Sequence, residues 1–334
     1  MGLARFAAIR AAATLAVALL VSVVLFAAVE LLPGDAAITI LGQNATPERV
    51  EELRTELRLD DSAVDRYATW IGGVVRGDLG ESVVSQRPVW SVIETPARNS
   101  LLLGILSFSA MLVVAVALGV LSGRSPGGRA DRLTTTTTSA IASVPDFVMG
   151  GLLIVLFATW IEIFPAVSLV SVGESPLDDP IILVLPAATL ALVGGSFGAR
   201  LIRAVIADEA ATPHVDAAVL AGLSERRIVL RHLLPGVIGP IAQVLASLAP
   251  YAVGGAIVVE RLFGYPGIGA ALVDHLAARD VTVVEAIGLI LTAVVLLALF
   301  TADLIGAASD PRRRSGVTAP DRADAETERV LELR

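Results

Sequence analysis

Long runs of apolar residues, separated by polar segments, are the dominant pattern along this chain. A helix that crosses the bilayer's hydrocarbon core needs about 20 apolar residues, and its backbone polar groups must all be satisfied internally. Six stretches meet this requirement: Ala11–Leu32, Asn99–Leu121, Leu133–Ile161, Ile181–Ala199, Leu233–Val259 and Val281–Ala302. The pattern therefore predicts an all-α, polytopic membrane protein with six transmembrane helices.

The first apolar run has features of both a signal peptide and a membrane anchor. Arg5 and Arg10 precede it, as basic residues precede the apolar core of a secretory signal. That core is about 7–15 residues long, whereas this run is longer and has no clear small-x-small cleavage site. The first run is therefore predicted to be an uncleaved anchor.

Arginine is distributed unevenly among the segments that connect the spans. The connections after the second, fourth and sixth spans contain Arg124, Arg129, Arg132, Arg200, Arg203, Arg226, Arg227, Arg231 and Arg312–Arg314. The connections over Phe164–Pro180 and Phe263–Asp280 contain only one arginine, Arg279. Because cytoplasmic loops are enriched in basic residues, both termini are predicted to be cytoplasmic.

The spans divide the chain into four parts. Residues 1–32 form the cytoplasmic N-terminus and first span, and residues 33–98 form an external helical segment. Within that segment, Thr46-Pro47-Glu48 has the N-cap, first-turn proline and acid of a helix start, which predicts helices over 48–59 and 63–75. Residues 99–306 form a five-helix core with a cytoplasmic loop at 208–235. Residues 307–334 form a cytoplasmic tail that is predicted to be disordered.

Composition excludes several classes of function. Charged residues make up 17% of the 334 positions, against about 25% in soluble domains, which excludes a soluble enzyme. The chain has no Cys and no Lys, which excludes disulfides, thiolate metal sites, Schiff-base chemistry and a phosphate-binding P-loop. The three His lack metal-ligand spacing. A formal net charge of −8 argues against nucleic acid as a partner.

The cytoplasmic loop at 208–235 has helix signals of its own. Thr212-Pro213 supplies an N-cap and a first-turn proline, and Gly222 can end that helix in the left-handed conformation. Ser224-Glu225 starts a second helix that runs through Arg231 and stops near Pro235. Its apolar residues flanked by arginines fit either a groove on another protein or an anionic lipid surface, and the residues alone favour neither.

Several short motifs in this chain resemble those of one transporter family. Asp216-Ala217-Ala218-x-x-x-Gly222, followed by Leu234-Pro235, resembles the EAA loop of bacterial ABC-importer permeases, with Asp in place of the usual Glu. Other matches are to the B-type subunit of the oligopeptide/dipeptide/nickel permeases. They are Leu32-Pro33-Gly34-Asp35, Ala45-Thr46-Pro47-Glu48, Arg76-Gly77-Asp78-Leu79-Gly80, Val259-Glu260-x-x-Phe263-x-x-Pro266-Gly267-x-Gly269 and Asp310-Pro311-Arg312.

The resemblance implies a type I ABC-importer permease fold in the bacterial cytoplasmic (inner) membrane. It also implies a C-type partner permease, two ATP-binding subunits or domains, and an extracytoplasmic substrate-binding protein. ATP and Mg would act in the ATPase partners, so this chain would bind no cofactor and catalyse no reaction. Asp216, Ala217, Ala218, Gly222 and Pro235 would couple it to the ATPase. The substrate would be a di- or oligopeptide, with a nickel chelate or a glutathione-like compound as alternatives.

Asp146 is an acid in the middle of the third apolar run. A carboxylate at the bilayer centre costs at least about 2.5 kcal/mol and usually faces a cavity or a partner. One hypothesis is that Asp146 lines the substrate pathway and contacts a cationic part of the substrate. The alternative is a protonated or Arg-paired residue at a subunit interface. A secondary transporter that uses Asp146 for proton coupling is the competing function.

Glu260 ends the fifth span beside Arg261 and precedes a turn rich in glycine and proline. With Phe263, Pro266, Gly267 and Gly269, it is a candidate for an outer gate or for a contact with the binding protein. The alternative is a solvated ion pair with Arg261, and a tight external turn in which the glycines have a purely structural role.

Residues 194–198 match the Gly-x-Ser-x-Gly pattern of a hydrolase nucleophile. That pattern requires a strand–turn–helix context and a His partner, whereas here it lies in an apolar run with every His outside the spans. Small residues in a membrane helix allow close helix packing, which is the function predicted for this segment.

Overall fold

The computed structural model describes residues 3–31, 38, 45–56, 61–124, 126–171 and 173–309. Within these residues the regular structure is helical, with one isolated bridge between Glu81 and Pro88, which confirms the all-α prediction. Five helices are long and apolar enough to cross a membrane. They are α1 (Leu3–Glu30), α5 (Val89–Gly123), α8 (Val184–Ala210), α11 (Leu234–Phe263) and α13 (Val281–Ser309). Most of the predicted tail at 307–334 lies outside the described residues.

The third predicted span is not one continuous helix. It consists of α6 (Arg129–Ala142), α7 (Asp146–Leu153) and the π-helix η2 (Ile154–Trp160), and the chain bends by 102° between α6 and α7. Pro145 stands at the break, where its ring lacks an N–H and restricts Val144 away from the helical region. The expectation of a single helix over Leu133–Ile161 is corrected, and the bent pair supplies a sixth candidate span.

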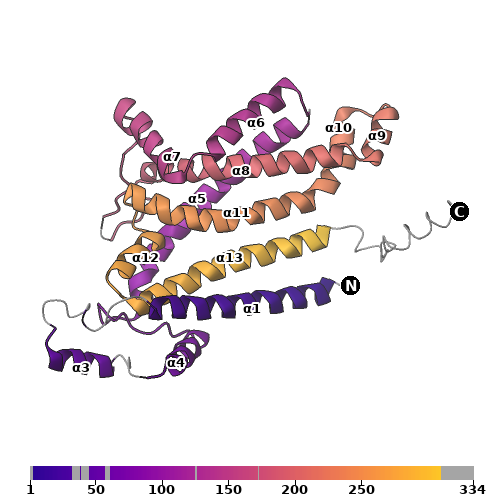
Figure 1. Cartoon of the computed structure of the whole chain (residues 1–334). Helices are drawn as coiled ribbons and strands as arrows, with labels where there is room; N and C mark the ends of the chain where they lie inside the picture. The colour runs from indigo at the N-terminus through magenta and orange to yellow at the C-terminus, as the bar shows by residue number, and fades with distance from the viewer. Residues whose placement is uncertain are drawn as a thin grey trace.

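Figure 1 shows the long helices α8, α11, α13 and α1 running side by side. At one end lie the short elements of the 208–235 loop, together with the first residues of α1 and the last residues of α13. These elements are α9 (Pro213–Leu220), α10 (Glu225–Ile228) and η4 (Val229–Leu233). The opposite end carries α3 (Pro47–Glu56), α4 (Ala63–Val75) and α12 (Ile268–Ala277).

Helices α5 and α8 approach each other closely because glycines line their contact. A Cβ on Gly119 would lie 2.7 Å from Ile202, and one on Gly123 would lie 2.8 Å from Ile206. From the other side, a Cβ on Gly195 would lie 2.8 Å from Val114. The prediction that the 194–198 segment permits close packing is confirmed.

The external segment packs on the outer end of α1. Helix α4 begins at the predicted position, with Ser62 as its N-cap. Tyr67 contributes a hydroxyl that lies 2.8 Å from Ser22, and its ring packs edge-on against Phe26. Helix α3 covers Pro47–Glu56, so it follows the predicted start, while residues 57–60 of that prediction lie outside the described residues.

Asp280 ties a second part of the external segment to the connection between α12 and α13. It is fully buried and accepts hydrogen bonds from the Ser82 hydroxyl at 2.6 Å and the Val83 amide at 3.1 Å. Nδ1 of the His275 ring lies 3.0 Å from Oδ2, the oxygen that also accepts the Ser82 hydroxyl. These contacts join residues nearly 200 positions apart, since Ser82 and Asp280 are separated by 198.

A Cβ at the α5–α8 contact is predicted to destabilise the protein. In Gly119→Ala the new methyl group would overlap Ile202 and the Ala199 carbonyl, with an expected loss of about 1–3 kcal/mol. Gly104→Ala is the matched control on the same helix, because nothing lies within 4 Å of its Cβ and alanine favours helix by about 1 kcal/mol. The thermal midpoint in detergent should fall for the first variant only; equal midpoints would contradict the packing account.

Candidate functional site

The loop at 208–235 folds into the first helix that its sequence predicts. Helix α9 has Thr212 as its N-cap and Pro213 in its first turn, and it ends after Leu220. Gly222 then takes a left-handed conformation with φ +69°, as predicted. Its amide donates to the Val219 carbonyl at 2.9 Å, and the next amide donates to the Ala218 carbonyl at 3.3 Å. This pair of bonds is a Schellman motif, so Gly222 sets the direction in which the chain leaves α9.

One side of α9 is buried and the other is presented to solvent. Val215 and Ala218 are buried against the rest of the protein. Leu220, by contrast, is 89% exposed and Val219 is 57% exposed, at the free end of the helix. Asp216 and Ala217 are also exposed. Helix α9 therefore presents an apolar tip, which costs free energy in water unless another surface covers it.

The root of α9 is fixed by polar contacts with both neighbouring helices. The Thr212 hydroxyl donates to the Glu209 carbonyl at 2.6 Å, at the end of α8. The His214 ring lies 3.1 Å from the His232 carbonyl, in the π-helical turn before α11. Gly236 of α11 lies against the Glu209 carboxylate, since a Cβ there would be 2.0 Å from Oε1 unless that side chain moved. These contacts join α9 to α8 and α11 at its base.

The second helix of the loop does not stop near Pro235, which corrects the sequence prediction. The candidate span runs from Arg226 to Phe263, and Pro235 lies inside it and is exposed. The π-helical segment Val229–Leu233 precedes this proline. Proline lacks an N–H, and in an α-helix its ring would collide with the carbonyl four residues earlier. A widened turn before the proline accommodates the ring and lets the helix continue.

An ion pair that the sequence analysis missed joins α6 to α8. Arg203 binds the Asp131 carboxylate through two nitrogens, at 2.5 and 2.7 Å. The same carboxylate accepts the Gly127 amide at 2.7 Å and the Thr135 hydroxyl at 3.1 Å, and Asp131 is 3% exposed. The sequence did contain a signal for an ion pair, since Asp131 is the one acid among Arg124, Arg129 and Arg132.

At the end of the molecule opposite α9, Glu260 is a buried hydrogen-bond centre. Its carboxylate accepts the Gly269 amide at 2.8 Å and the Ala270 amide at 3.1 Å, which are free amides in the first turn of α12. The Ser100 hydroxyl donates to its other oxygen at 2.5 Å. Glu260 is 1% exposed. A carboxylate from α11 therefore caps a different helix, α12, and also binds α5.

The predicted ion pair between Glu260 and Arg261 does not form. Arg261 instead pairs at 2.7 Å with Asp274 of α12, and both side chains are more than half exposed. Adjacent residues on a helix point in different directions, so Glu260 faces the protein while Arg261 faces solvent. The interpretation of Glu260 as a solvated residue is therefore wrong.

The glycines of the external turn are required by the position of Glu260. A Cβ on Gly267 would lie 2.2 Å from the Glu260 carboxyl carbon, and one on Gly269 would lie 2.7 Å from the Ile257 backbone. Phe263 is fully buried, and its carbonyl accepts the Ser168 amide at 2.7 Å. The predicted gate residues are thus brought together in one compact turn.

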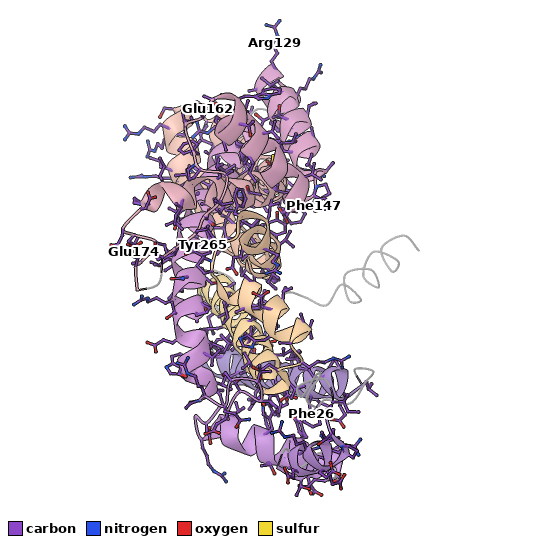
Figure 2. All side chains as sticks on the ribbon, turned by 90° about the vertical axis from the view of Figure 1, so that its left-hand side faces the viewer. Phe26, Arg129, Phe147, Glu162, Glu174 and Tyr265 are labelled. Carbon is purple, nitrogen blue, oxygen red and sulfur yellow. The ribbon has the colours of Figure 1, made fainter. Side chains whose placement is uncertain are left out.

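Two polar residues that the sequence analysis did not single out complete this turn. The Tyr265 hydroxyl donates to the Asn99 carbonyl at 2.8 Å, and the Asn99 side chain donates to the Pro266 carbonyl at 2.9 Å. Tyr265 is fully buried and lies well inside the end of the molecule that faces the viewer in Figure 2. Burial and then the nearby Glu260 carboxylate raise the pKa of the Tyr265 phenol, which keeps it a neutral donor.

Asp146 lies at the start of α7, immediately after the break in the third span. Its Oδ1 accepts a hydrogen bond from the hydroxyl of Tyr251 on α11. The neighbouring Phe147 is 57% exposed and lies at an outer edge of the ribbon in Figure 2. Among the described residues, no group of three or more His, Asp or Glu side chains could hold a metal ion.

The sequence is similar to membrane components of bacterial importers. Residues 115–315 match the family of the binding-protein-dependent transport system inner membrane component, and residues 3–98 match the N-terminal domain of such membrane components. A probable peptide ABC transporter permease of Sinorhizobium fredii is 30% identical over 305 residues, which cover 91% of this chain and 97% of the relative. A glutathione transport system permease of Escherichia coli K12 is 32% identical over 295 residues, with coverages of 88% and 94%.

Removal of the Glu260 carboxylate is predicted to loosen α12. Glu260→Ala would leave buried amides without an acceptor, at an expected cost of about 3 kcal/mol. Hydrogen exchange, followed by mass spectrometry on peptides that contain Gly269 and Ala270, should become at least tenfold faster. Asp274→Ala is the control, since the exposed pair that it breaks is worth at most about 1 kcal/mol. Unchanged exchange in Glu260→Ala would refute the capping role.

Proposed function

Because this chain belongs to the family of binding-protein-dependent transport system inner membrane components, we propose that it is the B-type permease of an ATP-driven peptide importer. Its role as a membrane permease component follows from the family. The substrate class is supported by relatives that are named as peptide and glutathione permeases. Di- or oligopeptides are the proposed cargo. The family assignment gives no support to the alternative of a proton-coupled secondary transporter.

The observation that supports energy coupling is the apolar tip of α9. Leu220 and Val219 project from a short helix whose base is fixed to α8 and α11. Such a tip fits a groove on an ATPase subunit, which would cover its apolar surface. Asp216, Ala217, Ala218 and Gly222 build this helix and its exit, and Pro235 lies in the helix that follows. We assign these residues to coupling.

The proposed assembly contains three other kinds of subunit. A C-type permease would complete the pathway, two ATP-binding subunits would bind at the cytoplasmic face, and an extracytoplasmic protein would deliver the substrate. The ATPase partners would use ATP and Mg, because this chain has no Lys and therefore no P-loop. This chain would accordingly act as a transport subunit without an ATPase site.

The orientation follows from the arginines of the α9 end. The start of α1, the end of α13 and α9 lie at one end of the molecule (Figure 1). Arg124, Arg129 and Arg226 are located in the loops of this end, which supports its placement in the cytoplasm. In this proposal both termini are cytoplasmic and the protein is a multi-pass component of the bacterial cytoplasmic membrane.

The external turn around Glu260 would then face the binding protein. Its core is rigid because Glu260, Ser100 and the α12 amides form one hydrogen-bonded unit. Pro266, Gly267 and Gly269 shape the loop, and Phe263 anchors it. We propose that this unit acts as the outer gate or as the base on which the binding protein docks.

Disruption of the α9 exit is predicted to release the ATPase. In Gly222→Trp the Cβ meets nothing within 4 Å, but the left-handed backbone is strained for any residue with a Cβ, by about 1–2 kcal/mol. The strain and the added bulk should displace the apolar tip. An affinity-tagged chain, co-expressed with its ATPase subunits, should lose at least nine-tenths of the ATPase that co-purifies with the wild type (roughly a tenfold weaker association).

Two further variants make this experiment specific. Gly77→Trp is the matched control, because Gly77 also has a positive φ and open space around its Cβ but lies at the opposite end of the chain's fold. It should retain the ATPase. Leu220→Asp leaves the backbone unchanged and places a charge on the apolar tip, so it should release the ATPase as Gly222→Trp does. Retention of the ATPase by Leu220→Asp would overturn the coupling role of α9.

A further inference from the structure

We propose that Asp146 and Tyr251 form a binding site, within the membrane, for the ammonium group of the transported peptide. This inference rests on the proposed function, and it assigns a substrate contact to a pair of residues on two different helices. Asp146 supplies the negative charge, and Tyr251 positions the carboxylate through the hydrogen bond to Oδ1.

The carboxylate of Asp146 is only partly satisfied within the chain. Tyr251 is a neutral donor and occupies one oxygen. Among the described residues, no Arg or His forms an ion pair with Asp146, whereas Asp131 and Asp274 each have an arginine partner. An uncompensated carboxylate is unfavourable in a membrane, so the missing positive charge is expected to come from outside this chain.

Asp146 stands at a helix start and is only partly buried. The break between α6 and α7 places Asp146 at the start of a helix, where a negative charge is favourable. Opposite it, the Cβ position of Gly255 lies 2.8 Å from Leu190 and 3.4 Å from Oδ2, so the glycine lets α11 approach Leu190 and Asp146 closely. Asp146 itself is partly exposed rather than buried.

Helix α11 presents a small and polar face next to Tyr251. Its outward residues are Gln243, Ser247, Pro250 and Gly254, all of them exposed. Ser247 and Tyr251 are four positions apart and so share one face of the helix. Toward the α9 end of the molecule, Gln243 and Ser247 line a cavity of about 430 Å³ that also includes Arg10 and Asp303. Asp146 and Tyr251 do not line this cavity, but the exposed Gln243 and Ser247 are polar groups that are more favourable in water than against lipid.

The position of the pair along α11 is also appropriate for a pathway site. Tyr251 is nine residues before Glu260, which corresponds to about 13 Å along the helix axis. The pair therefore lies well below the external turn, near the middle of the span.

The amino terminus of a peptide has a pKa of about 8 and is cationic at neutral pH. It can replace the missing countercharge without any covalent step.

The test uses the assembled transporter in lipid nanodiscs, without the binding protein. Dialanine is the probe, N-acetyl-dialanine is the uncharged comparison, and saturation-transfer NMR measures the binding of each. The wild type should bind dialanine at least tenfold more tightly than its acetylated form. Asp146→Asn should abolish this difference and Asp146→Glu should restore part of it. Asp274→Asn, which removes an exposed acid elsewhere, should match the wild type.

Each other result would overturn the assignment. Equal binding of the two probes by the wild type, or no binding of dialanine, would exclude an amine site. A preference for dialanine that survives in Asp146→Asn would exclude Asp146. If Asp146→Asn and Asp146→Glu both fail to assemble with their partners, the carboxylate has a structural role at the subunit interface instead. Assembly of the wild-type complex with its ATPase separately tests the proposed function.

Discussion

The close contact between α5 and α8 is the constraint on which the other parts of this structure depend. Glycines on both helices remove the side chains that would hold them apart, since a Cβ on Gly119 or Gly195 would overlap the facing helix. Lipid tails are as apolar as the side chains, so association within a membrane relies on such close packing. Helix α8 then connects the external loop to α9, while α5 supplies Asn99 and Ser100 to the external turn.

Three acids of this chain differ in how fully its own groups satisfy them. Glu260 receives two amides and a hydroxyl, and Asp131 receives a two-nitrogen contact from Arg203 with an amide and a hydroxyl. Asp146 receives one phenol. The first two therefore hold helices together at opposite ends of the molecule. Asp146 has capacity for a further partner, which is the basis of the proposed amine site.

Local patterns in the sequence predicted the elements but not the contacts between distant residues. The apolar runs predicted the spans. Thr212-Pro213 predicted the start of α9 and Gly222 predicted its end, because these signals act within one helix. The break at Pro145 was not predicted. Other prolines of this chain, Pro96, Pro240 and Pro250, lie inside continuous helices. A proline alone therefore does not distinguish a broken helix from an intact one.

The partners of the charged residues were beyond sequence reasoning for a related reason. Arg203 and Asp131 are 72 positions apart, and their meeting depends on how α6 packs on α8. Glu260 was paired with its neighbour in sequence, whereas its partners are amides that the following turn brings back toward it. Pairing of this kind is a property of the folded chain.

The same contacts determine how movement of α9 would reach the proposed amine site. Thr212 joins α9 directly to the end of α8, and Arg203 attaches α6 to α8 through Asp131. Helix α6 leads to the break, after which α7 begins with Asp146. Displacement of α9 by an ATPase would therefore move α8 and α6 together. The helical hydrogen bonding is interrupted at Pro145, so such a movement would be expected to change the distance between Asp146 and Tyr251.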